Sequence, residues 1–259
     1  MNWFELTYVA LVGLAIGSFL NAVVYRLPRK IPFGLSRSVC PTCKKQIRAL
    51  DNIPLVSYMI LRGRCRDCKS KISFRYPAVE ALNAAVYIWL YFHYGLSVEL
   101  AMAAIFSSAL LAIIFIDLEH MIIPDVITLP GIGLALGYSL TSAGMGMLPS
   151  LLGAVVGGGS LYAIALLGDW LFKKESMGGG DIKMAAALGA LLGWKNVLLV
   201  FFVSALIGLL VSIVVMVFSA KFRRERMLPF GPFLALAGFF AMIYGERTIK
   251  LYSDYLAGR

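Results

Sequence analysis

Long stretches without a single charged residue are the feature of this sequence that most constrains its fold. The uncharged runs are 20 residues at Leu6–Tyr25, 43 at Val126–Gly168 and 25 at Asn196–Ala220. A helix that crosses a bilayer needs about 20 consecutive, predominantly apolar residues, so the longest run holds two spans. The mean hydropathy of +0.82 agrees with this interpretation. The sequence therefore predicts a helical membrane protein that contacts the lipid bilayer along much of its length.

Further apolar segments extend the prediction to an all-α polytopic membrane protein with about eight transmembrane helices. The first segment is not a signal peptide, because it has no basic residues before its apolar core and is too long for a cleaved apolar region. The predicted spans are roughly residues 4–25, 78–96, 98–117, 124–141, 147–171, 181–194, 196–220 and 229–251.

Lysine and arginine are distributed very unevenly between the two sides of this arrangement. The loop between the first two spans holds 13 of the 24, and segments 173–183 and 221–226, on the same side, bring the number to 20. Because basic residues are retained in the cytoplasm, the loop is predicted to be cytoplasmic and both termini to face outward. Orientation and contact with anionic lipid account for most of the net charge of +10, so no nucleic-acid partner is expected.

All four cysteines lie in the predicted cytoplasmic loop and form two similar pairs. Cys40-x2-Cys43 is followed after 21 residues by Cys65-x2-Cys68, and each pair begins a Cys-x-x-Cys-Lys-x-x-Ile repeat. Two such pairs place four thiolates at the corners of a tetrahedron, which suits Zn²⁺. Two disulfides are the alternative, but the reducing cytoplasm disfavours them. Four protein ligands leave no position for water, so the zinc is expected to be structural and to hold a small cytoplasmic loop domain.

Two aspartates at the ends of apolar segments are the candidate catalytic residues. Asp117 ends the third predicted span, and Asp181 follows Gly178–Gly180 at the start of the sixth, so both lie on the cytoplasmic side. Ionisable residues at membrane depth indicate function by default, and two carboxyls that share one proton can hydrolyse a peptide bond. The segment from Asp181 to Trp194 is only about 21 Å long as a helix. Asp181 is therefore expected below the membrane surface, beside a water-accessible notch.

The positions of the two aspartates on their helices suggest a division of roles. Asp181 lies at a helix N-terminus, where the helix dipole favours negative charge, and Asp117 lies near a C-terminus. We expect Asp181 to start as the base that activates water and Asp117 as the acid that protonates the departing amine. The three glycines leave room for a substrate backbone to approach. Asp125, which follows Pro124, is expected to help cap the next helix.

The order and spacing of these motifs make the chain closely resemble the type IV prepilin peptidases, bifunctional GxGD-type aspartic peptidases of bacterial inner membranes. A lone GxGD is weak, but the ordered set together with the cysteine spacing is highly specific. Lys44 and Lys69 depart from the family, in which a glycine commonly follows each cysteine pair, and both are expected to be tolerated on the loop surface. The matching segments are Gly17–Asn21, Tyr25–Pro28, the two cysteine pairs, Asp51–Pro54, Leu61–Arg64, Arg75–Glu80, Asp117–Asp125, Gly178–Lys183 and Pro229–Pro232.

The resemblance implies a substrate and a second activity. These enzymes cut the basic leader from prepilins and pseudopilins at the cytoplasmic face, and then methylate the new N-terminal amine with S-adenosylmethionine. The family's catalytic aspartates match Asp117 and Asp181. The sequence offers no nucleotide-binding turn, because the glycines at 131, 133 and 137 lie inside a predicted span and favour helix packing. Glu80 is the one candidate for contacting the methyl donor, and a salt bridge to a loop arginine is its alternative role.

Two other functions stay open at this point. A presenilin-like general intramembrane aspartic protease shares the GxGD motif but has no four-cysteine loop. A non-catalytic, zinc-containing membrane transporter would place paired carboxylates near the midplane of repeated halves, and no such repeat is seen. In the preferred interpretation Glu119, Asp125 and Glu175 are candidates for receiving the basic leader. The predicted divisions are 1–25 as the first transmembrane helix, 26–77 as the zinc-binding loop associated with methyl transfer, and 78–259 as the helical peptidase core.

Overall fold

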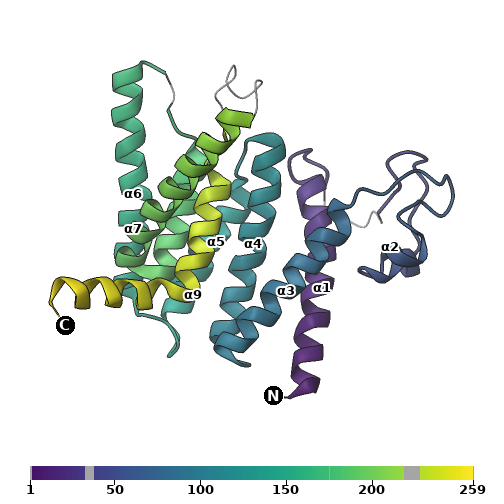
Figure 1. Ribbon diagram of the computed structural model, residues 1–259, viewed down its shortest axis with the longest axis horizontal. Helices are drawn as coiled ribbons and strands as arrows, with labels where there is room; N and C mark the ends of the chain where they lie inside the picture. Colours follow the sequence, from purple (N-terminus) through teal and green to yellow (C-terminus); the bar gives the residue numbers. More distant parts are fainter. Residues whose placement is uncertain (1, 33–37, 175, 219–227, 259) are drawn as a thin grey trace. The chain divides into compact units, whose positions relative to one another are not determined.

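The computed structural model describes residues 2–32, 38–174, 176–218 and 228–258, and helices account for most of them (Figure 1). The chain divides into two compact units, Met1–Ala112 and Ile113–Arg259, and the division falls within α4. The elements are α1 (Trp3–Arg26), η1 (Ala49–Asn52), α2 (Val56–Ile60), α3 (Arg75–Tyr94), α4 (Val98–His120), α5 (Asp125–Ser139), α6 (Met147–Phe172), α7 (Gly179–Phe218) and α9 (Gly231–Leu256).

The helices follow the predicted spans closely, which confirms the all-α membrane fold. Among the described residues, four helices are long and apolar enough to cross a membrane, namely α1, α4, α6 and α7. The sixth and seventh predicted spans together form α7, a 40-residue segment that is interrupted at Gly193. The backbone of Gly193 has φ 80° and ψ 167°, a conformation that suits glycine and ends the regular helix there. The interruption therefore falls next to the predicted boundary at residues 194–196.

In the first unit, α1 packs antiparallel to α3 through small and amide side chains. A Cβ atom added to Gly17 would lie 2.7 Å from the Cα of Glu80, so only glycine permits this approach. One turn away on each side, the Asn83 amide donates to the carbonyl of Gly13 at 2.8 Å, and the Asn21 amide donates to that of Tyr76 at 3.0 Å. These interhelical hydrogen bonds fix the register of α1 against α3, from which the loop between them departs.

The cysteine loop of the first unit contains two turns of the same construction, as the sequence repeat predicted. In the first, the N–H of Cys40 donates to Lys45 O at 2.9 Å, and the N–H of Lys44 donates back to Cys40 O at 2.9 Å. In the second, the N–H of Cys65 donates to Ser70 O at 2.8 Å, and the N–H of Lys69 donates to Cys65 O at 3.1 Å. One isolated antiparallel bridge closes each turn, between Val39 and Gln46 and between Arg64 and Lys71.

In the second unit, α7 is the central helix and packs through glycines against its neighbours. Gly153 of α6 lies directly against the carbonyl of Gly189, and α6 runs antiparallel to the first part of α7. On another side, a Cβ on Gly238 of α9 would lie 2.8 Å from a methyl carbon of Leu188. Small residues at these crossings allow close approach of the backbones, which is how apolar helices gain packing energy in a membrane.

Candidate functional site

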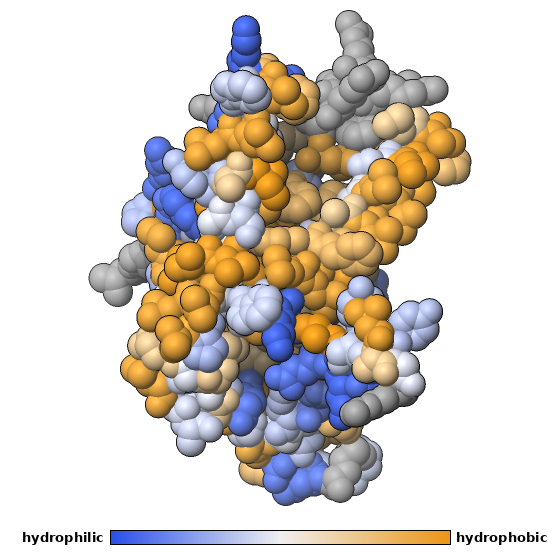
Figure 2. Space-filling view, turned by 90° about the vertical axis from the view of Figure 1, so that its left-hand side faces the viewer, coloured by the Kyte–Doolittle hydropathy of each residue, from blue (hydrophilic) through white to orange (hydrophobic). Residues whose placement is uncertain are grey.

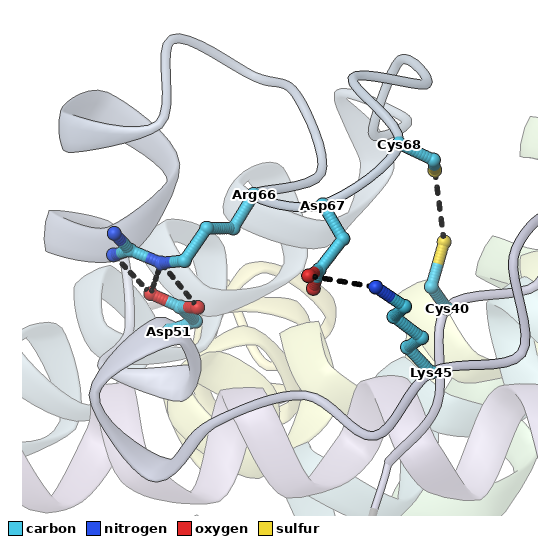
Figure 3. Close-up of polar contacts among 6 residues, drawn as sticks. All are labelled: Cys40, Lys45, Asp51, Arg66, Asp67 and Cys68. Carbon is cyan, nitrogen blue, oxygen red and sulfur yellow. Dashed lines mark hydrogen bonds and ion pairs between the residues drawn. The ribbon is translucent and has the colours of Figure 1, made fainter.

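The four cysteine thiols of the loop come together as the sequence predicted. Their sulfur atoms all lie within 4.8 Å of one another, and those of Cys40 and Cys68 are 3.8 Å apart (Figure 3). All four cysteines are free, and their arrangement as one cluster favours a metal site over two disulfides. A tetrahedral zinc site with Zn–S bonds of about 2.3 Å has sulfur atoms about 3.8 Å apart. The thiols therefore fit a zinc ion with little rearrangement.

Local hydrogen bonds lower the pKa of Cys40 and so favour its thiolate, which is the form that binds metal. The backbone N–H of Cys43 lowers the pKa of Cys40 to about 6, against the opposing effect of burial. At Cys43 the N–H of Lys45 lowers the pKa, but burial and the neighbouring thiols outweigh it and raise the pKa to about 11. Ionisation of Cys40 thus opposes that of Cys43, and a divalent ion would offset the combined charge of a thiolate cluster.

The lysine after each cysteine pair adopts a backbone conformation that favours glycine. Lys44 has φ 60° and Lys69 has φ 59°, in the left-handed region. A side chain in this region costs roughly 1–2 kcal/mol relative to the right-handed conformation. Both residues are exposed, so their side chains fit on the loop surface, but the backbone of each turn is strained where the resembled family commonly has glycine.

Ion pairs connect the second cysteine turn to the rest of the loop (Figure 3). The Arg66 guanidinium donates to both carboxylate oxygens of Asp51, the shortest contact being 2.6 Å, and the Asp51 side chain is only 8% exposed. This hydrogen-bonded guanidinium lowers the pKa of Asp51 below its ordinary value. Lys45 of the first turn reaches Asp67 of the second at 3.3 Å. The loop is thus held by charged contacts in place of a large apolar core.

Glu80 proves to be a buried anchor for the loop. Its side chain accepts a hydrogen bond from the N–H of Leu55 at 2.9 Å, and the residue is 8% exposed. Leu55 has φ 59° and ψ −49°, an unusual conformation for a side chain of this size, and the bond to Glu80 helps hold it. Among the described contacts of Glu80, this backbone bond takes the place of the salt bridge to a loop arginine that the sequence left open.

Asp117 and Asp181 are brought together at one end of the second unit. Asp117, near the end of α4, is 5% exposed, and its Oδ2 accepts the N–H of Gly231 at 3.1 Å. Asp181 lies in the first turn of α7. Ile123 joins the two helix ends, since its side chain lies against Gly231 and its backbone against Gly180. Gly231 belongs to the Pro229–Pro232 motif of the sequence analysis, but nothing in the sequence indicated that it would be a partner of Asp117.

The two carboxyl groups are close enough to interact electrostatically. Oδ1 of Asp181 is buried and has no hydrogen-bond partner within the described protein. A buried carboxylate oxygen without a partner is unusual and indicates a place for a water molecule or a substrate group. One oxygen of Asp117 is already engaged by Gly231, whereas Oδ1 of Asp181 is left open to a water molecule or a substrate group.

The three glycines before Asp181 differ in what surrounds them. A Cβ on Gly180 would lie 2.7 Å from the Cβ of Ile123, and one on Gly178 would lie 3.2 Å from Oδ2 of Asp181. A Cβ on Gly179 would have no atom within 4 Å. Gly180 is therefore required by packing within the protein, whereas the space beside Gly179 is the part of the run that a substrate backbone could approach.

The aspartate pair is recessed relative to the ends of two apolar helices. Gly158 of α6 lies beside Ile182, and α6 continues for 14 residues to Phe172, or about 21 Å. The second part of α7 passes Phe233 at Gly208 and continues for 10 residues to Phe218, about 15 Å further. Hydrophobic side chains form a broad area across the middle and upper part of the view in Figure 2. Both helices therefore extend beyond the level of the aspartates, and the depth of Asp181 in a membrane stays a prediction.

The prediction that Asp125 caps its helix is wrong. Pro124 is the N-cap residue of α5 and no side chain caps it, while Asp125 is the first helical residue. The Asp125 carboxylate binds Lys183 of α7 instead, with both oxygens 2.7 Å from the Nζ atom. An ammonium group is a stronger partner for a carboxylate than a neutral backbone N–H, which explains the choice. Of the other acidic candidates, Glu119 lies 3.9 Å from His120, and Glu175 lies outside the described residues.

Comparisons with known proteins match two parts of the chain to family models. Residues 11–94 match the bacterial peptidase A24 N-terminal domain, and residues 104–213 match the type IV leader peptidase family. Proteins named prepilin leader peptidase/N-methyltransferase are similar over nearly their whole length. The one from Legionella pneumophila is 34% identical over 98% of this chain and 96% of its own, and the one from Aeromonas hydrophila is 36% identical over 97% and 95%.

A third such relative, from Pseudomonas aeruginosa, is 35% identical over 95% of this chain and 92% of its own. No solved structure matches this chain. The relatives support a peptidase and methyltransferase, and they support neither the presenilin-like protease nor the transporter. The chain belongs to the type IV leader peptidase family.

Proposed function

We propose that this protein removes the leader peptide from prepilins and pseudopilins with Asp117 and Asp181, and then methylates the new N-terminus. The observation that carries the peptidase assignment is the electrostatically coupled pair of aspartates, one of which keeps a buried oxygen without a partner. A pair of carboxyls sharing one proton supplies both the base and the acid that peptide hydrolysis needs. The names of the relatives supply the substrate class.

In the proposed reaction, Asp181 takes a proton from water as the water oxygen attacks the scissile carbonyl carbon. The resulting tetrahedral intermediate collapses as Asp117 donates a proton to the leaving amine, and the C–N bond breaks. The N–H of Gly231 holds Asp117 in place during both steps. Because the two carboxyls interact, the apparent pKa values of the pH–rate profile belong to the pair as a whole.

The methylase activity is assigned to residues 26–77, where the zinc cluster of Cys40, Cys43, Cys65 and Cys68 would act as a structural centre. S-adenosylmethionine would supply an activated methyl group to the new N-terminal amine. Glu80 stays a candidate for contact with this donor, since it lies where the loop meets α3. The peptidase core is assigned to residues 78–259.

The uneven distribution of basic residues supports a multi-pass arrangement in a bacterial inner membrane with the active site facing the cytoplasm. The recessed position of the aspartates supports a substrate whose apolar segment stays in the membrane while the scissile bond enters from the side of the basic loop. Such a substrate reaches the enzyme by lateral diffusion, because a basic leader gains no attraction from a basic loop.

The test is to incubate the purified protein with a prepilin and S-adenosylmethionine and to weigh the products. The parent should remove the leader and add one methyl group. Asp117→Asn and Asp181→Asn should each lose cleavage by at least about 100-fold, yet methylate a peptide that has already been cut. Asp254→Asn, a carboxyl change near the end of α9, is the matched control and should cleave normally. Normal cleavage by either dyad variant would refute the assignment.

A further inference from the structure

The ion pair between Asp125 and Lys183 stands at the edge of the proposed dyad. Asp125 follows Ile123 by two residues, and Ile123 lies against Gly180. Lys183 follows Asp181 by two residues on α7. The two residues are 58 positions apart in the sequence and come from α5 and α7. Their ion pair therefore lies close to the first turn of α7, which carries Asp181.

The Asp125–Lys183 ion pair is more exposed to solvent than the ion pair between Asp51 and Arg66, in which the cation also contacts both carboxylate oxygens. The side chains of Lys183 and Asp125 are 40% and 52% exposed, whereas Asp51 in its pair with Arg66 is only 8% exposed. An exposed pair of this kind contributes little to stability, because water solvates both charges and the long lysine side chain loses entropy when it is held. Another cation can therefore replace Lys183 on Asp125 at small cost, while Arg66 stays fixed on Asp51.

We propose that the Asp125–Lys183 pair is an exchangeable recognition site, in which a basic residue of the peptide substrate displaces Lys183 and binds Asp125. The ammonium of Lys183 then moves into solvent, and no covalent bond changes. An arginine of the substrate gains more than a lysine, since its planar guanidinium donates a separate N–H to each carboxylate oxygen, whereas a lysine shares one nitrogen between them. Lys183 acts as a stand-in cation that keeps Asp125 paired until a basic substrate arrives.

The exchange also gives selectivity against neutral and acidic peptides. A neutral side chain cannot displace Lys183, and an acidic one is repelled by Asp125. Asp125 is thus a specificity-determining residue of the peptidase site, outside the pair that carries the chemistry. This inference rests on the proposed peptidase function.

The test uses two prepilin peptides that differ at one position of the leader, lysine in one and glutamine in the other. Lys183→Gln should lower KM for the lysine peptide about three- to fivefold, because Asp125 no longer has a competing cation. Asp125→Asn should raise KM for the same peptide by a similar factor. Neither variant should change KM for the glutamine peptide, and kcat should stay near that of the parent. Lys195→Gln, another exposed lysine of α7, should leave both peptides unaffected.

A purely structural role for the pair predicts a different result. Both variants would then change kcat or KM equally for the two peptides, and that outcome would overturn the proposal. The charge swap Asp125→Lys with Lys183→Asp adds a second arm, since it keeps an ion pair but should abolish the preference for the lysine peptide. Binding of the same peptides to Asp181→Asn, with and without Lys183→Gln, tests the exchange even if the parent cuts neither peptide.

Discussion

Oδ2 of Asp117 accepts a hydrogen bond from the backbone N–H of Gly231 at 3.1 Å, between residues 114 positions apart in the sequence. The first turn of α9 thereby fixes one oxygen of an aspartate near the end of α4. Ile123 fills the space beside this contact and also lies against Gly180, next to Asp181. The end of α4 and the first turns of α7 and α9 thus pack around Ile123. This packing positions the two aspartates relative to each other.

Gly231→Ala should impair cleavage strongly. Its Cβ would lie 2.6 Å from Oδ2 of Asp117 and 2.9 Å from Cδ1 of Ile123, so the carboxyl group must move. If Asp117 is catalytic as proposed, a displacement of about 1 Å costs on the order of 100-fold in rate. The measurement is kcat for prepilin cleavage, with Gly137→Ala on α5 as the control, because a Cβ at Gly137 meets no atom within 4 Å. Equal stability and equal activity of the two variants would contradict the packing argument.

The purified protein should contain about one zinc ion per chain, held by the four cysteines. Cys40→Ser should release the metal and leave the loop open to proteases, because the loop has little apolar core of its own. Elemental analysis gives the stoichiometry, and limited proteolysis reports the state of the loop. Ser38→Ala, a nearby change that removes no ligand, serves as the control. Full zinc content in Cys40→Ser would contradict the assignment.

Lys44→Gly and Lys69→Gly should each strengthen the metal site. Glycine relieves the positive φ of the turn, and because both side chains are exposed no packing is lost. The gain is partly offset by the greater freedom of glycine in the unfolded loop, so each change should stabilise by up to about 1 kcal/mol. The measurement is the rate at which a chelator removes zinc. Lys71→Gly, at a position without a positive φ, should speed the loss of zinc or leave it unchanged.

Asp51→Asn should weaken the loop at neutral pH and lose its effect in acid. The Arg66 guanidinium lowers the pKa of Asp51 in the folded loop, so the pair stabilises the loop above the unfolded-state pKa of about 3.9. That contribution declines as the pH falls through the still lower folded-state pKa. The measurement is the ratio of hydrogen-exchange rates in the loop between parent and variant at each pH. If the exchange-rate ratio of variant to parent grows as the pH falls, the ion pair does not stabilise the loop in the predicted pH range.

The sequence by itself determined the helical spans and the cluster of four cysteines. Both depend on local patterns, since a run of apolar residues long enough to cross a bilayer and a pair of cysteines two residues apart restrict the structure wherever they lie. It also indicated Asp117 and Asp181, because charged residues at the ends of apolar helices are costly and so stand out. Lys44 and Lys69 stand where the resembled family commonly has glycine, and the structure shows a positive φ at both positions.

Only the tertiary structure decided which groups surround the two aspartates. The contact of Gly231 with Asp117, the packing of Ile123 on Gly180 and the pairing of Asp125 with Lys183 all join segments far apart in the chain. These contacts depend on the register in which glycine-containing helices pack, and small shifts along a helix axis would exchange one neighbour for another. Asp125 shows the consequence: local sequence favoured a helix cap, but the register of α5 against α7 placed an ammonium group within its reach.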